Sequence, residues 1–137
     1  MFYVYEITTP ANTPKENPKE TIAKLVRGVI HRVEIMFPPG PSGLLHVQIW
    51  RGGHQIYPSV TGQSFASDNE TIAFNDFYEL KHHPTYLRII TWNEDTLFDH
   101  MCRVRIGVLP KYIVDPRLMF EDLRNKMTIL LRRIGAI

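Results

Sequence analysis

The stretch YLRIITWNEDTLFDHMCRVRIGVLP, residues 86–110, decides the fold class. Its two halves, 86–93 and 98–110, alternate apolar with polar side chains, which is the period of a half-buried β-strand. In the second half the apolar face comprises Cys102, Val104, Ile106 and Val108, while Arg103 and Arg105 share the other face. The short polar segment EDTL between the halves predicts that the two strands form a hairpin.

The same alternation recurs toward the N-terminus. In VIHRVEIMF, residues 29–37, the apolar face comprises Val29, Val33, Ile35 and Phe37. The turn formers PPGPSG at 38–43 separate this run from LLHVQIW at 44–50, so the two strands are predicted to pair as neighbours. Shorter strand-like runs occupy 2–8, 70–74 and 77–80, with a turn or bulge expected at Asn75 and Asp76.

About eight strands with turns every eight to twelve residues predict an all-β fold, an antiparallel two-sheet β-sandwich. Jelly-roll-like and immunoglobulin-like strand orders both remain open. The predicted organisation is an N-terminal strand and proline-containing arm at 1–21, a sandwich domain at 22–110 and a helix at 111–137. Three prolines and the absence of large apolar side chains predict that 9–21 is an extended, exposed linker.

The pattern changes after Pro110 to the spacing of an amphipathic α-helix. Asp115 followed by Pro116 is typical of a helix start, and Gly135 is placed to end the helix. Its apolar stripe consists of Met119, Phe120, Leu123, Met127, Leu130, Leu131 and Ile134. Three destinations for this stripe remain open: the sandwich itself, other copies of the chain in a bundle, or a different protein. A wide stripe rich in Met and Leu is typical of partner-binding helices.

Composition excludes several classes of protein. The 137 residues carry a formal net charge of +2 without a long cationic stripe, which argues against a nucleic-acid partner. No apolar run is long enough for a membrane span or a signal peptide, so we expect no membrane partner and synthesis in the cytoplasm. Cys102 is the single cysteine, which excludes an internal disulfide and favours an inert core thiol.

Catalytic and metal motifs are weak. The six histidines match no metal-ligand spacing, so we expect no metal and no cofactor. In GGHQIYPSVTGQSFASDNE, residues 52–70, a serine could meet a histidine and an aspartate, but no GxSxG motif occurs. The candidates for such a triad are Ser59, Ser64 and Ser67 with His54 or His100 and Asp68 or Asp99. We predict that the protein is not an enzyme and that 52–70 is a contact loop crossing between the sheets.

Aromatic side chains near strand ends offer an alternative function. Trp50, Tyr57 and Trp92 could form a stacking platform for sugars, with the amides of Gln55, Gln63 and Asn93 nearby. This alternative is a glycan- or receptor-binding sandwich module that uses the 52–70 loop.

The layout resembles small accessory structural proteins of tailed bacteriophages, the head-decoration and tail-associated β-sandwich proteins. The resemblance lies in the arm YEITTPANTPKENP, the sandwich body and the tail helix. It implies a homo-oligomer, often a trimer, attached to a larger structural protein in a virion. Assembly would then use the helix stripe and the N-terminal strand residues Phe2, Tyr3, Val4, Tyr5 and Ile7. The sequence thus predicts a non-enzymatic virion component.

Overall fold

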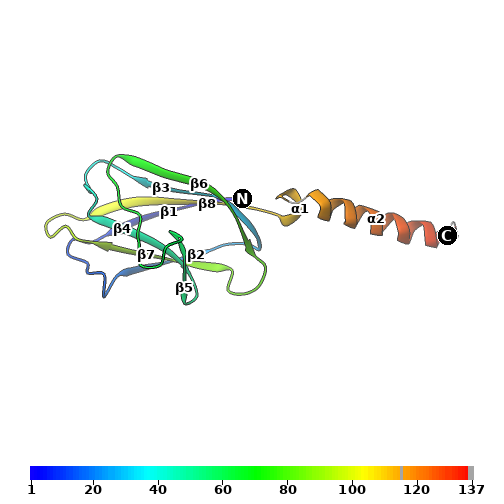
Figure 1. Ribbon diagram of the computed structural model, residues 1–137, viewed down its shortest axis with the longest axis horizontal. Helices are drawn as coiled ribbons and strands as arrows, with labels where there is room; N and C mark the ends of the chain where they lie inside the picture. The colour runs from blue at the N-terminus through cyan, green and yellow to red at the C-terminus, as the bar shows by residue number, and fades with distance from the viewer. Residues whose placement is uncertain (115, 136–137) are drawn as a thin grey trace.

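The computed structural model describes residues 1–114 and 116–135 and contains eight strands in two antiparallel sheets, followed by helix (Figure 1). The first sheet, in the order β1-β8-β3-β6, comprises β1 (Phe2–Thr9), β8 (His100–Leu109), β3 (Gly28–Phe37) and β6 (Glu70–Leu80). The second sheet, in the order β2-β7-β4-β5, comprises β2 (Lys19–Lys24), β7 (Tyr86–Asn93), β4 (Leu45–Arg51) and β5 (His54–Tyr57). The predicted antiparallel two-sheet architecture is confirmed.

The strand pairing follows a simple rule. β1 pairs with β8, β2 with β7, β3 with β6 and β4 with β5, so the first four strands fold back on the last four. The reversal point is the β4–β5 turn at Gly52 and Gly53, where Gly52 has a φ of 56°. Two further pairings, β3 with β8 and β4 with β7, complete the sheets.

Two predicted pairings are wrong. Residues 86–93 and 98–110 form no hairpin, because β7 lies in the second sheet and β8 in the first. For the same reason 29–37 and 44–50 are not neighbours, since β3 and β4 belong to different sheets. Face-to-face sheets lie about 10 Å apart, so a short connection can span them as readily as it closes a hairpin. The alternation of side chains is identical in both cases, and sequence period alone does not distinguish them.

The core lies between the sheets and follows the predicted alternation. The fully buried core side chains that the alternation predicted are Val33, Ile35, Phe37, Leu45, Val47, Ile49, Cys102, Val104, Ile106 and Val108. The prediction was wrong for Val29, because a β-bulge between Ile30 and Arg32 shifts the alternation, so that Ile30 belongs to the core cluster and Val29 is buried outside it. On the outer face of the first sheet, Arg103 pairs with Glu6 at 3.2 Å and Arg105 with Glu34 at 3.4 Å. Burial of each large aliphatic side chain contributes about 1.5–3 kcal/mol, so this core stabilises the sandwich without a disulfide.

Sequence reasoning missed β2 and β5. β5 lies within 52–70, so the inter-sheet crossing is confined to 58–69, between β5 and β6. The expected linker 9–21 instead ends in the first residues of β2, and its preceding part folds against β7. There the Thr13 N–H donates to the Asn93 carbonyl at 3.1 Å, and the Asn93 N–H donates to Thr13 at 3.0 Å.

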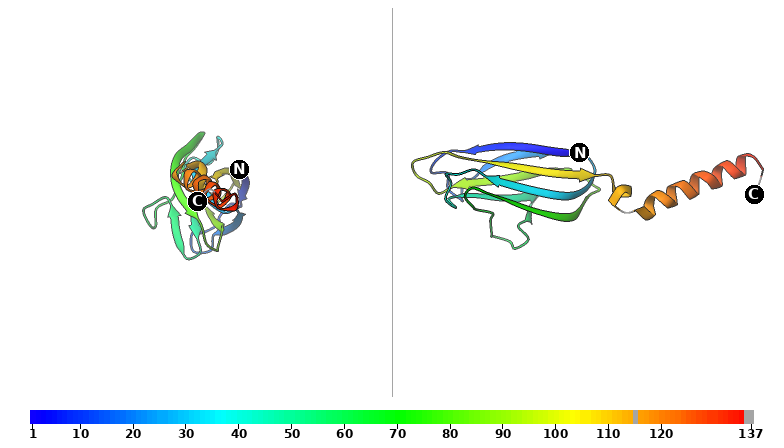
Figure 2. Two further views of the ribbon diagram at one scale, coloured as in Figure 1. Left: turned by 90° about the vertical axis from the view of Figure 1, so that its right-hand side faces the viewer. Right: turned by 90° about the horizontal axis from the view of Figure 1, so that it is seen from above.

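Two helical segments follow β8, the short α1 (Lys111–Val114) and the long α2 (Pro116–Arg133). The predicted helix is thereby confirmed, while its expected cap Asp115 lies outside the described residues. Gly135 has a φ of 74° and donates its N–H to the Arg132 carbonyl, which ends the helix as predicted. Figure 2 shows α2 extending away from the sandwich along the long axis of the molecule.

Candidate functional site

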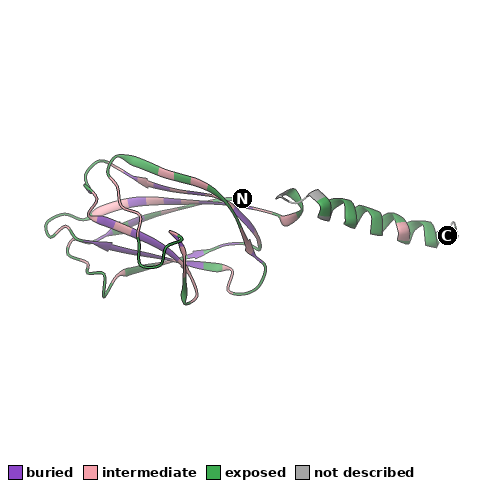
Figure 3. Ribbon diagram, viewed as in Figure 1, coloured by how far each residue is buried: buried purple, intermediate pink, exposed green. Residues whose placement is uncertain are grey.

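Many of the exposed large apolar side chains in the described residues lie together on α2. Figure 3 shows the helix exposed along nearly its whole length. Within the stripe, Phe120 is 66% exposed, Leu130 58% and Ile134 68%. The other members are also solvent-accessible, namely Met119, Leu123, Met127 and Leu131. Monomeric soluble proteins rarely leave such a contiguous apolar strip in water, so the strip indicates a contact surface.

The helix has few stabilising contacts of its own. Asp122 and Lys126 form an exposed i,i+4 ion pair at 2.9 Å, and the Thr128 hydroxyl donates to the Arg124 carbonyl at 3.0 Å. An i,i+4 ion pair contributes only about 0.3–0.5 kcal/mol. Because most of the stability of a helix in a protein comes from packing of its amphipathic face, these contacts alone give α2 little stability.

α1 fixes the start of the helical segment to the sandwich. Lys111 Nζ lies 2.9 Å from Glu79 Oε1 on β6, beside a cavity of about 380 Å³. A second cavity, of about 540 Å³, lies between α1 and the first turns of α2 and is lined by Lys111, Tyr112, Met119, Asp122 and Lys126. The sandwich therefore contacts α1, while the stripe on α2 stays open.

The N-terminal strand is part of the first sheet. β1 pairs with β8 over its whole length, with Ile7 buried and Tyr3 and Tyr5 packed against the core. The Tyr5 hydroxyl donates to the Lys24 carbonyl at 3.0 Å, and burial, with a smaller effect of Tyr3, raises the pKa of Tyr5. Of the five residues predicted to bind a partner, Phe2 and Val4 remain exposed on the outer face. β1 is thus bound within its own chain.

Tyr57 lies inside the sandwich, apart from the two tryptophans. Its ring packs edge-on against Phe74 with centroids 5.1 Å apart, and its hydroxyl donates to Asp76 Oδ2 at 2.7 Å. Burial, together with this hydrogen bond to Asp76, raises the pKa of Tyr57 well above its usual value. This side chain is therefore unavailable to a ligand at the surface.

Trp50 and Trp92 lie together on the outer face of the second sheet. They flank a groove of about 230 Å³ lined also by Lys15, Pro18, Gln48, Arg88 and Ile90. Trp92 is only 4% exposed, because His46 stacks on it with centroids 5.0 Å apart and Lys15 Nζ lies 5.4 Å from its ring centroid. The Trp50 indole N–H donates to Gln48 at 3.0 Å. A sugar could therefore stack only on the partly exposed Trp50.

The structure forms none of the expected serine triads but brings together three other side chains. Ser64 Oγ lies 2.8 Å from His46 Nδ1, and Glu94 Oε1 lies 3.2 Å from His46 Nε2. The Nε2 atom is buried and has no hydrogen-bond partner, so its approach to Glu94 is a close contact without a hydrogen bond. Sequence reasoning missed this group because Ser64, His46 and Glu94 come from three separate segments. The contacts tie the 58–69 crossing to β4 and to the β7–β8 loop.

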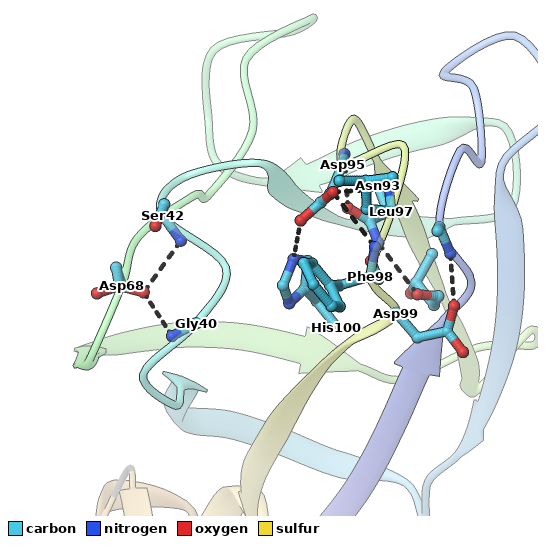
Figure 4. A network of polar contacts seen from close by, with 11 residues as sticks. Gly40, Ser42, Asp68, Asn93, Asp95, Leu97, Phe98, Asp99 and His100 are labelled. Atoms are coloured by element: carbon cyan, nitrogen blue, oxygen red, sulfur yellow. Dashed lines mark hydrogen bonds and ion pairs between the residues drawn. The ribbon is translucent and has the colours of Figure 1, made fainter.

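A polar network orders the loops at the end of the sandwich opposite α2 (Figure 4). The backbone N–H groups of Gly40 and Ser42 donate to Asp68 Oδ1 at 2.8 and 3.0 Å. His100 Nε2 lies 2.7 Å from Asp95 Oδ2. The network holds the β3–β4 and β7–β8 loops in fixed conformations.

Asp95 also positions two exposed apolar side chains at this end of the sandwich. Its Oδ1 accepts the backbone N–H groups of Leu97 at 2.9 Å and Phe98 at 3.3 Å. Leu97 is 77% exposed and Phe98 65% exposed. We call these two residues the distal apolar pair.

The network predicts a specific dependence of stability on pH. Hydrogen bonds from the backbone N–H of Ser42 and then of Gly40 lower the pKa of Asp68. At Asp95 the backbone N–H of Leu97, followed by the His100 side chain, lowers the pKa. Because the pKa is lower in the folded state, the ionised carboxylate stabilises the fold. This stabilisation is fully present above the pKa of the unfolded state, about 4, and is lost as pH falls through the pKa of the folded state. We expect the denaturant concentration at the unfolding midpoint to decrease as the pH is lowered through this acid range. The decrease should be smaller in the Asp68→Asn, Asp95→Asn double variant. Identical pH profiles for the two proteins would contradict this assignment.

Other candidate sites are limited. Among residues 1–114 and 116–135, no group of three or more His, Cys, Asp or Glu side chains lies close enough to hold a metal ion. No helix in the described part of the chain is long and apolar enough to cross a membrane. Cys102 is buried, and burial raises its pKa to about 12, so its thiol is unreactive at neutral pH.

No protein family model matches the sequence, and no curated protein resembles it significantly. The geometry of α2 and of the sandwich is therefore the basis for assigning a function.

Proposed function

We propose that the protein is a non-enzymatic structural subunit that associates with copies of itself through α2 and attaches to a larger protein assembly. The observation that carries this proposal is the exposed apolar stripe of α2, which extends beyond a sandwich with a complete core of its own. The stripe of this helix stays exposed beside the sandwich, and burial against another chain would stabilise it.

The size of the stripe is sufficient for association. Burial of each half-exposed side chain on association contributes about 1 kcal/mol of favourable free energy, so the seven members of the stripe contribute roughly 7 kcal/mol per chain. The loss of translational and rotational freedom opposes association by about 4–15 kcal/mol. Two or three chains that bury their stripes against one another can therefore offset this loss.

The strand order supports a jelly roll as the finer description of the fold. The pairing of β1 with β8, β2 with β7, β3 with β6 and β4 with β5 is that of one long hairpin rolled into two sheets. Jelly rolls recur in viral capsid proteins, and this analogy at the level of fold agrees with a decoration or tail-associated protein of a virion. On this basis the subunit belongs to a particle, most simply as a trimer.

The distal apolar pair supports a second contact, with the larger assembly. The β7–β8 loop, which carries Leu97 and Phe98, lies at the end of the sandwich opposite α2 (Figure 1), so a partner can reach these exposed side chains while α2 is engaged. Because Asp95 holds both backbone N–H groups, the pair is presented without the entropy cost of ordering a loop.

The test of the proposal is removal of the helical segment. We expect residues 1–110 to fold into the sandwich, because the core contacts of all eight strands are retained, and to lose self-association. Circular dichroism would report the β-structure and light scattering the mass. A truncated protein that keeps the oligomeric mass of the full chain would remove α2 from the account, and an unfolded truncated protein would contradict the independence of the sandwich.

A further inference from the structure

The stripe of α2 contains a regular heptad seam. Phe120, Leu123, Met127, Leu130 and Ile134 follow one another at alternating spacings of three and four residues. This is the repeat of the a and d positions of a coiled coil, with Phe120, Met127 and Ile134 at a. All five side chains are more than half exposed. The seam therefore fits another helix with the same repeat, and a second copy of this chain supplies one.

The flanking charges favour a parallel arrangement of the helices. Arg124 occupies an e position and Lys126 a g position. In a parallel pair a g residue lies beside the e residue of the next heptad in its neighbour, which places Lys126 beside Leu131. There the aliphatic stem of the lysine can cover the leucine while its ammonium group stays in water.

An antiparallel pair would bring like charges together. In that arrangement e faces e and g faces g, so a centred register places Arg124 against Arg124 and Lys126 against Lys126. A register shifted along the seam instead places Lys126 against Arg133 of the neighbour. Both registers carry a repulsion that the parallel arrangement lacks.

The width of the stripe indicates the number of helices. Met119 at g and Leu131 at e extend the apolar surface to both sides of the seam. A two-stranded coiled coil buries mainly a and d, whereas a helix that contacts two neighbours also covers part of e and g. A closed arrangement of three identical helices buries both sides of the stripe at once.

We propose that α2 forms a parallel three-stranded coiled coil with two other copies of this chain, with all three sandwiches at the same end. This inference rests on the proposed function and adds the identity, orientation and number of the partners. It also places the three distal apolar pairs on the side of the sandwiches away from the coil, because each α2 leaves its sandwich at the opposite end (Figure 2).

The orientation is tested with single cysteines in the full chain. Phe120→Cys and Leu130→Cys lie at opposite ends of the seam, and Asn125→Cys, on the outer face, is the matched control. The native Cys102 is buried and unreactive, so wild-type protein gives the background. Each variant is oxidised at micromolar concentration, alone and as an equal mixture of the two seam variants, and analysed on a non-reducing gel and by light scattering.

We expect a disulfide in each seam variant alone and none with Asn125→Cys. Because three thiols meet at one level of the coil, one in every three stays unpaired and cross-linking stops at about two thirds of the chains. Complete cross-linking of either seam variant would overturn the number of strands. A disulfide that forms only in the mixture would overturn the parallel orientation, and an oligomer without seam disulfides would overturn the parallel coiled coil while leaving self-association intact. A monomeric mass of the wild-type chain would overturn both this inference and the proposed function.

Discussion

Leu123→Asp is expected to convert the oligomer into a monomer with a folded sandwich. Leu123 occupies a d position in the seam, where every copy in the assembly would bury one introduced carboxylate against the others. Burial of an unpaired charge costs several kcal/mol, and like charges at one level repel. We expect association to weaken by at least about 100-fold, so that light scattering at micromolar concentration gives the mass of one chain, 16.0 kDa.

Ile129→Asp is the matched control for this variant. Ile129 is also an exposed apolar residue of α2, 51% accessible, but it lies at a c position away from the seam. Both variants place the same poor helix former in the helix interior, and their losses of helix propensity differ by only a few tenths of a kcal/mol, roughly the gap between Leu and Ile. We expect Ile129→Asp to retain the wild-type mass. If the two variants dissociate equally, the loss reflects the helix as a whole and the heptad assignment is wrong.

Asn93→Asp is expected to destabilise the sandwich by about 3 kcal/mol at neutral pH. Asn93 is 1% exposed, and its side-chain amide donates to the carbonyls of Thr9 at 3.3 Å and Phe98 at 3.0 Å. A carboxylate would face those two carbonyl oxygens as a third acceptor and leave its charge buried. Urea unfolding of the truncated 1–110 protein measures this change without a contribution from assembly.

The control is Asn75→Asp, the same chemical change at an exposed position. The Asn75 side-chain oxygen accepts a hydrogen bond from Arg32 at 3.1 Å, and a carboxylate oxygen accepts it at least as well. We expect no loss of stability there. The penalty of Asn93→Asp should shrink at acid pH, because the protonated carboxyl regains one donor. A penalty that is small at neutral pH, or unchanged on acidification, would refute the role of Asn93.

The core-facing side of most of the long strands was predictable from the sequence, whereas the pairing of strands was not. Alternation identified Val33, Ile35, Val104 and Ile106 as core residues because burial on one face imposes a period of two. The sheet to which a strand belongs depends on long-range contacts that leave the period unchanged. The same limit explains β2 and β5, which are short edge strands with few buried side chains and therefore a weak periodic signal.

The helical stripe was predictable because its signal lies in the local sequence, whereas the grouping of residues at the ligand site depends on the tertiary structure. Spacings of three and four identify an amphipathic helix locally, and the structure exposes that stripe as a candidate contact surface. The grouping of Trp50 with Trp92, and the separation of Tyr57 from them, depends on which sheet face each residue occupies. The pairing of His46 with Ser64 and Glu94 depends on how two loops fold over β4, which no local pattern encodes.

The most direct test of the central claim is the mass of the full chain in solution, measured by light scattering across a concentration series. We expect a mass of about 48 kDa, three times the 16.0 kDa of one chain, at concentrations where Leu123→Asp protein is monomeric. A wild-type mass of 16.0 kDa up to high micromolar concentration would contradict it.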